Sequence, residues 1–148
     1  MGMNAWTALV AALVTLHPTD SPAATVSVQC PERISVEEIA KATYPSWEMT
    51  TDKGKVDVHL QSMLLYDGQP REMASLVPDR TTEARGLLVA TWRLTKMEPD
   101  RGYWVGCAYR NSMTLLTKRL PDTVSSCRFT QKILRSGTLA GVESFVCE

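Results

Sequence analysis

Four cysteines lie far apart along the chain, and the way they pair limits how it can fold. They are Cys30, Cys107, Cys127 and Cys147. An even number is typical of a disulfide framework in an exported protein, whereas a zinc site needs closely spaced Cys or His pairs that this sequence lacks. Cys127 and Cys147 are symmetric about Gly137 in the turn-forming stretch LRSGTLAG. We therefore expect them to face each other across a hairpin.

The other pair is then Cys30 with Cys107. The competing pair, Cys107 with Cys127, is centred on Thr117 in the strand-like stretch TLLTKRL. In a three-strand meander its two residues would lie about 9–10 Å apart, beyond disulfide reach. We predict the disulfides Cys30–Cys107 and Cys127–Cys147, each stabilising the fold by on the order of 3 kcal/mol.

The first residues have the pattern of a secretory signal. Residues 5–16, AWTALVAALVTL, are apolar and uncharged but too few to span a bilayer, and the small residues Ser21 and Ala23 follow. We predict a signal peptide over residues 1–23, cut after Ala23 or alternatively after Ala24. A single exported domain, residues 24–148, would remain in the periplasm or be secreted, with no integral membrane segment. A frayed core helix is the competing interpretation, because the opening MGMN contains no Lys or Arg.

Alternation of apolar and polar residues predicts β-strands in the exported part. In residues 56–66, one face is expected to carry the apolar side chains of Val56, Val58, Leu60, Leu64 and Tyr66. The opposite face carries Asp57, His59 and Gln61. Further strands are expected at residues 86–94, 103–109, 113–120, 125–134 and 141–147, with turn residues between them.

Residues 34–42, ISVEEIAKA, fit either a short helix capped by Ser35 and Glu38 or a strand. The alternation that runs from Thr25 to Val36 favours the strand. We therefore predict a mostly β fold class, or α+β if the helix forms. The architecture is a single antiparallel β-sandwich or small barrel stapled by two disulfides.

Several kinds of chemistry have little support in the sequence. Lys plus Arg and Asp plus Glu number 16 each, so no basic field attracts nucleic acid. Neither a phosphate loop nor metal-ligand spacing is present, and we expect no cofactor and no metal. A polar strand face explains Asp57 and His59 without catalysis. Asp67 and Asp79 are candidates for an acid pair, but Asp-Gly and Pro-Asp also form turns. We expect no enzyme.

Residues 67–86 show no strand or helix period, and connections of this length are uncommon in compact domains unless they are functional. The stretch combines arginines with large apolar side chains, a mixture enriched at interface centres. The residues predicted to contact a partner are Arg71, Met73, Ser75, Leu76 and Asp79. The alternative is a stiff corner in which Leu76 and Val77 plug the end of the sheet. Trp92 is expected in the core, and Trp104 either in the core or exposed as a binding anchor.

A set of short segments follows one another in a characteristic order. They are CP at residues 30–31, YDGQP at 66–70, ASLVPD at 74–79, Trp92, WVGCAY at 104–109 and LP at 120–121. This set resembles a family of small exported proteobacterial proteins grouped under an uncharacterised Salmonella Typhi protein. The resemblance covers nearly all of residues 24–148, although KATYPSW lacks the family's glycine before Trp47. It brings no established enzymatic activity and no assigned catalytic residues. Because some members are encoded in secretion-system regions beside toxins aimed at peptidoglycan, it implies a periplasmic immunity or inhibitor protein.

We therefore predict a periplasmic immunity-type inhibitor whose loop occludes the cleft of a peptidoglycan-targeting enzyme. The partner would be a protein, and the chain itself would carry no catalytic residue. The alternative is a small-ligand-binding or cell-envelope structural module, which needs an open apolar pocket lined by Trp47 and Trp92.

Overall fold

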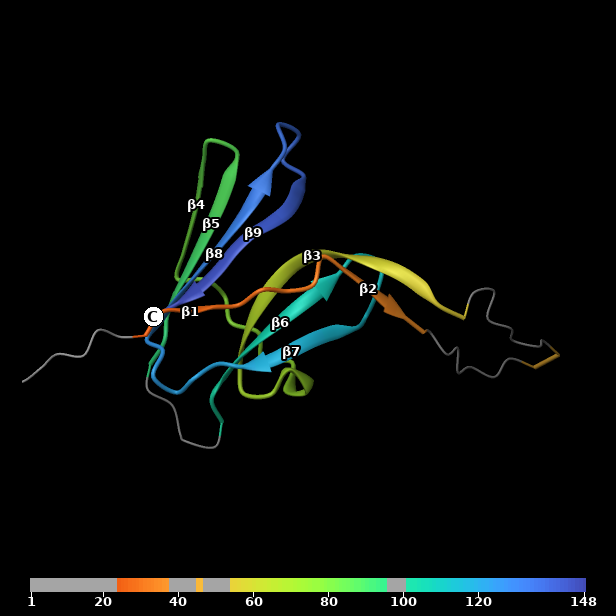
Figure 1. Ribbon diagram of the computed structural model, residues 1–148, viewed down its shortest axis with the longest axis horizontal. Coiled ribbons are helices and arrows are strands. Elements are labelled where there is room, and N and C mark those ends of the chain that lie inside the picture. The colour runs from red at the N-terminus through yellow and green to blue at the C-terminus, as the bar shows by residue number, and fades with distance from the viewer. Residues whose placement is uncertain (1–23, 38–44, 47–53, 96–100) are drawn as a thin grey trace, which may run out of the picture.

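The computed structural model describes residues 24–37, 45–46, 54–95 and 101–148. The predicted signal peptide, Trp47 and residues 38–42 of the ambiguous segment lie outside these described residues. Within the described part, nine strands form two antiparallel sheets (Figure 1). The prediction of a mostly antiparallel β domain is confirmed.

The five-stranded sheet has the order β1 (Val26–Ser27), β9 (Leu139–Cys147), β8 (Ser126–Ile133), β5 (Leu87–Arg93) and β4 (Arg80–Ala84). The four-stranded sheet has the order β2 (Arg33–Val36), β3 (Val56–Asp67), β6 (Tyr103–Tyr109) and β7 (Leu115–Arg119). A single turn of 3-10 helix, η1 (Pro70–Glu72), follows β3. The strand alternative for residues 34–36 is confirmed by β2.

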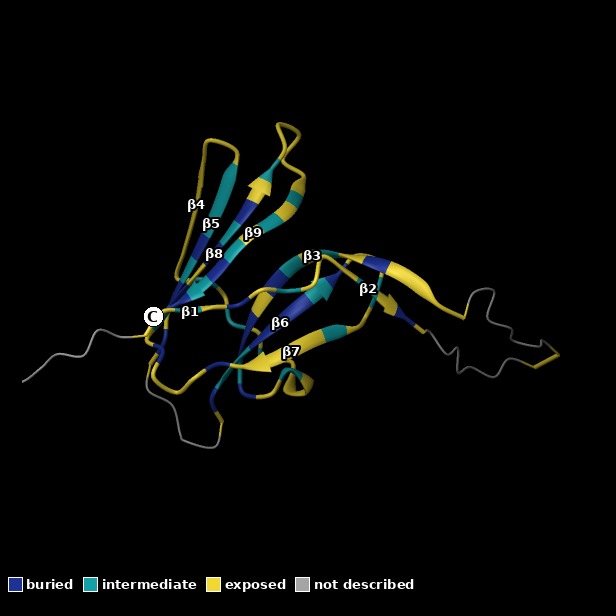
Figure 2. Ribbon diagram, viewed as in Figure 1, coloured by how far each residue is buried: buried dark blue, intermediate teal, exposed yellow. Residues whose placement is uncertain are grey.

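The main core lies between the two sheets. Phe145 of β9 is fully buried and packs in one cluster with Leu65 of β3 and Val105 of β6. The rings of Trp92 and Phe129 lie with their centroids 6.2 and 6.3 Å from that of Phe145. Figure 2 shows that burial is concentrated where the sheets approach each other and falls toward the far ends of the hairpins. The expected core position of Trp92 is confirmed.

A buried polar contact also joins the sheets, at an irregularity in β3. Gln131 of β8 is 1 % exposed, and its Nε2 donates to the carbonyl oxygen of Gln61 at 2.6 Å. The pairing of β3 with β6 shifts register between Leu60 and Ser62, and such a bulge turns the following side chains to the other face. The expected shared face is therefore wrong beyond this point. Met63 and Leu65 enter the main core, whereas Leu64 is 37 % exposed and Tyr66, although buried, lies outside that core and against Gly106.

Both predicted disulfides are present. Cys127 and Cys147 are register partners on β8 and β9, and Cys30–Cys107 joins the β1–β2 connection to β6. The three-strand meander used to rank the pairings is wrong, because the chain passes from one sheet to the other after β7. Cys107 and Cys127 consequently lie in different sheets.

The stretch expected to lack regular structure contains an edge strand, β4. All five of its residues are exposed, so an apolar alternation could not have marked it. Arg85 and Gly86 join β4 to β5 with φ values of 52° and 76°, as in the two-residue turns that suit hairpins.

Removing Cys30–Cys107 should weaken the fold strongly. Its sequence separation is 77 residues, and the chain-entropy relation gives about 4.5 kcal/mol for closing such a loop, against about 3.3 kcal/mol for the separation of 20 residues between Cys127 and Cys147. We expect Cys30→Ala/Cys107→Ala to lower the free energy of unfolding by several kcal/mol in urea titrations followed by tryptophan fluorescence. A loss below about 1 kcal/mol would contradict this stabilising role.

Candidate functional site: a fixed protruding loop

The loop after β3 consists of a tip, residues 68–73, and a return arm, residues 74–79. The two meet at a narrow base, where the amide of Asp67 donates to the carbonyl of Ala74 at 3.0 Å and that of Leu76 donates to Leu65 at 2.7 Å. Ser75 forms an isolated antiparallel bridge with Tyr66. The strand-like base therefore fixes where the tip leaves the sheet.

The local sequence explains the shape of the tip. Gly68 has a φ of +83°, a left-handed conformation that glycine adopts at little cost. Pro70 begins η1, where its missing N–H is not needed. Met73 ends the turn with a φ of 58°, and its amide donates to the carbonyl of Pro70 at 3.0 Å.

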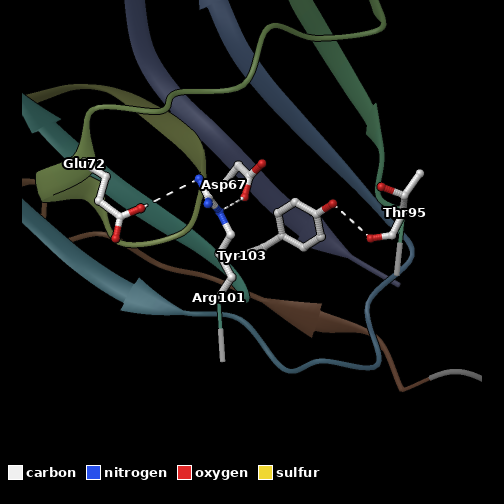
Figure 3. Close-up of polar contacts among 5 residues, drawn as sticks. All are labelled: Asp67, Glu72, Thr95, Arg101 and Tyr103. Atoms are coloured by element: carbon white, nitrogen blue, oxygen red, sulfur yellow. Dashed lines mark hydrogen bonds and ion pairs between the residues drawn. The ribbon is translucent and has the colours of Figure 1, made fainter. Parts of the chain in front are cut away.

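Arg101, just before β6, holds the tip against the sheet (Figure 3). Its Nε lies 2.7 Å from Oδ1 of Asp67, and its Nη2 lies 3.7 Å from Oε2 of Glu72. The amide of Gly68 donates to the carbonyl of Gly102 at 2.9 Å. A Cβ at position 68 would lie 2.9 Å from Oε2 of Glu72, whose flexible side chain could move aside, so the φ of +83° is the stronger reason for glycine here.

The return arm is fixed to β5. The indole N–H of Trp92 donates to the carbonyl of Leu76 at 3.2 Å, and the Leu76 side chain packs partly buried against the main core. The carboxylate of Asp79 accepts the backbone N–H of Arg93. The amide of Asp79 in turn donates to the carbonyl of Thr91 at 2.9 Å.

The five predicted contact residues therefore differ in their surroundings. Arg71 is exposed and Met73 is 84 % exposed, both on the tip. Ser75 is exposed at the base, whereas Leu76 and Asp79 make the structural contacts just described. The corner alternative is partly correct, because Leu76 packs on the core, but Val77 is 86 % exposed and plugs nothing.

An apolar hollow lies beside the tip, on the outer face of the four-stranded sheet. Its volume is about 350 Å³, and its lining is Gln69, Pro70, Arg71, Trp104, Met113, Leu115 and Thr117. Met113 is fully exposed, and Trp104 is half-buried with an indole N–H that has no hydrogen-bond partner among the described residues. The sequence pattern placed Trp104 opposite the Cys107 face but offered no sign that Met113 or Leu115 would join it.

The other candidate residues either lie away from this loop or make contacts that stabilise its conformation. His59 and Asp57 are exposed on β3, with Arg33 and Ser35 as their register partners on β2. Of the proposed acid pair, Asp67 binds Arg101 and Asp79 binds the backbone of Arg93.

Residues 24–37, 45–46, 54–95 and 101–148 contain no group of three or more potential metal ligands. In the same ranges, no helix is long and apolar enough to cross a membrane.

The structure is therefore a disulfide-stapled β scaffold that fixes an exposed loop tip beside an apolar hollow. Residues 45–148 match the family described as Type VI secretion system Tli immunity protein, and the chain therefore belongs to this family. Neither the curated proteins nor the solved structures include a significant match to it.

Family membership confirms the expected link to secretion systems, although the Salmonella Typhi grouping stays a prediction. It implies an immunity-type inhibitor of a type VI effector rather than an enzyme, and hence a protein partner. The two disulfides fit an oxidising compartment.

Arg101→Ala should loosen the tip without unfolding the domain. The ion pairs that it removes are partly exposed, and pairs of this kind contribute little to global stability. We expect faster hydrogen exchange at the amides of Gly68 and Met73 and an almost unchanged unfolding midpoint. Lys132→Ala, which removes the exposed pair with Glu143 on the other sheet, is the control. Unchanged exchange in the tip of Arg101→Ala would refute this role.

Proposed function

We propose that this protein is a periplasmic immunity protein that inhibits a type VI effector by placing residues 68–73 in the effector's cleft. The observation that carries this proposal is the contrast within the loop. Arg71 and Met73 project into solvent, whereas the base beneath them is held by backbone hydrogen bonds and by Arg101.

A fixed tip favours tight binding. A flexible loop loses conformational entropy when it is immobilised by a partner, whereas a preorganised loop has already lost it on folding. Here the disulfides, the Trp92–Leu76 hydrogen bond and the contacts of Arg101 fix the segment before the partner arrives.

The chemistry of the exposed residues suits the centre of an interface. Arginine, tryptophan and methionine are enriched at such centres, and Arg71, Met73, Trp104 and Met113 lie on or beside the tip. We assign Arg71, Met73 and Ser75 to direct contact with the effector. Leu76 and Asp79 support them by fixing the return arm, and the apolar hollow accepts a side chain of the effector.

Export and the class of effector belong to the same proposal. A signal peptide at residues 1–23 would deliver the chain to the periplasm, where the disulfides form. An inhibitor located there meets effectors that attack the cell envelope. We predict that its own effector cleaves peptidoglycan. Assaying a captured effector on purified peptidoglycan and on phospholipid vesicles would decide its substrate.

The loop is tested by capturing effectors from periplasmic extracts of cells that express candidate type VI toxins. We expect Arg71→Glu and Met73→Ala each to weaken effector binding at least about tenfold, as residues at interface centres do. The same variants should release the effector's activity at equal inhibitor concentration. Arg135→Glu, an equal charge reversal in the exposed β8–β9 turn, is the control. If neither tip variant alters affinity, occlusion by this loop is wrong.

Export is tested separately by fusing residues 1–24 to an alkaline phosphatase that lacks its own signal, because this reporter is active only after its disulfides form outside the cytoplasm. We expect periplasmic activity, and a purified full-length protein whose mass corresponds to a chain starting at residue 24 or 25. Leu9→Arg/Leu13→Arg, which interrupts the apolar run, should abolish both. Cytoplasmic retention of the unaltered fusion would overturn the assignment.

A further inference from the structure

Three arginines gather on the outer face of the five-stranded sheet, away from the main core. They are Arg80 on β4, Arg93 on β5 and Arg128 on β8. Because Trp92 and Phe129 point into the core, their strand neighbours point outward. The arginines line a hollow of about 740 Å³ together with Asp79, Thr82, Val89 and Thr91. We name it the arginine hollow.

Strand register places the three charges close together. Arg80 pairs with Thr91, and Thr91 pairs with Arg128, so the two arginines lie in one row two strand spacings apart, about 10 Å. Arg93 lies two residues beyond Thr91 on the central strand of the three and so faces the same way. The guanidinium groups therefore border one concave surface.

In the part of the chain that the structure describes, no carboxylate forms an ion pair with any of the three arginines. The one acid that lines the hollow, Asp79, accepts the backbone N–H of Arg93. Lys132, on the same face, is by contrast paired with Glu143. Glu148 lines the adjoining hollow with Arg93 and Arg128 but forms no ion pair with them. The three guanidinium groups therefore keep positive charge that an incoming anion would balance.

We infer that the arginine hollow binds a carboxylate-rich segment of a protein partner. Arginine forms paired hydrogen bonds with carboxylates, and the hydroxyls of Thr82 and Thr91 add further polar groups to the lining. The hollow includes Asp79, the last residue of the return arm. That this partner is the effector rests on the proposed function.

An anionic membrane fits the same surface less well. Lipid-binding segments typically carry clusters of four to eight Lys or Arg, whereas three arginines line this hollow. The surface is also concave, whereas a bilayer presents its phosphates on a broad and nearly flat surface. An acidic peptide segment can enter such a hollow and place single carboxylates beside the arginines.

The test is binding of a fluorescein-labelled peptide of eight glutamates, measured by anisotropy. We expect binding that weakens as salt rises. Each single Arg→Ala change should weaken it about threefold, and Arg80→Glu/Arg93→Glu/Arg128→Glu at least about thirtyfold. The matched control, Arg110→Glu/Lys118→Glu/Arg135→Glu, reverses three exposed charges elsewhere and should retain binding. If the triple Glu variant of the hollow does not fold, Arg80→Gln/Arg93→Gln/Arg128→Gln removes the same three charges, and its peptide affinity is measured instead.

Three results would overturn the inference: no binding of the peptide, equal loss in the control variant, or tighter binding to phosphatidylglycerol vesicles than to the peptide. The last result would identify a lipid surface as the ligand. Because the peptide assay uses no effector, its failure leaves the loop proposal intact. If the Arg71 and Met73 variants leave effector affinity unchanged, the result of the peptide assay still stands.

Discussion

The packing of the two sheets around Phe145 is the interaction on which the other features depend. Phe145 lies in one core with Leu65 and Val105 from the opposite sheet and with Trp92 from its own. Burying a side chain of this size stabilises the folded state by about 1.5–3 kcal/mol. The same core orients the Trp92 indole, which binds the return arm through Leu76. Interior packing therefore sets the position of the exposed tip.

Most strand positions and the Cys127–Cys147 pairing could be predicted because alternation and turn residues are local signals. Cys30–Cys107 was predicted by elimination, from a three-strand meander that the structure does not contain. The side-chain directions beyond Leu60 could not, because the bulge inverts the faces and no residue type marks it. Which strands belong to which sheet was also hidden, since the Leu120–Pro121 turn is equally compatible with a neighbouring strand in the same sheet. β4 lacked a signal because an exposed edge strand need not alternate.

In the candidate site too, features encoded by adjacent residues could be predicted, whereas contacts between residues far apart in the sequence could not. The exposed position of Arg71 and Met73 could be predicted because their turn is encoded by adjacent residues, Gly68 and Pro70. The structural contacts of Leu76 and Asp79 could not, because their partners lie 14 to 16 residues later on β5. The apolar and arginine hollows are more distant still, since each brings together side chains from strands that only the sheet topology makes neighbours.

The N-terminal segment has a consequence for the unit that folds. β1 pairs with β9 in one sheet, β2 pairs with β3 in the other, and Cys30 between them is bonded to Cys107. β1, β2 and Cys30 precede the region that matches the family, which starts at residue 45. A fragment trimmed to that region would present two unpaired strand edges and a free thiol, both of which promote association between copies. The autonomous folding unit is therefore longer than the region by which the family is recognised.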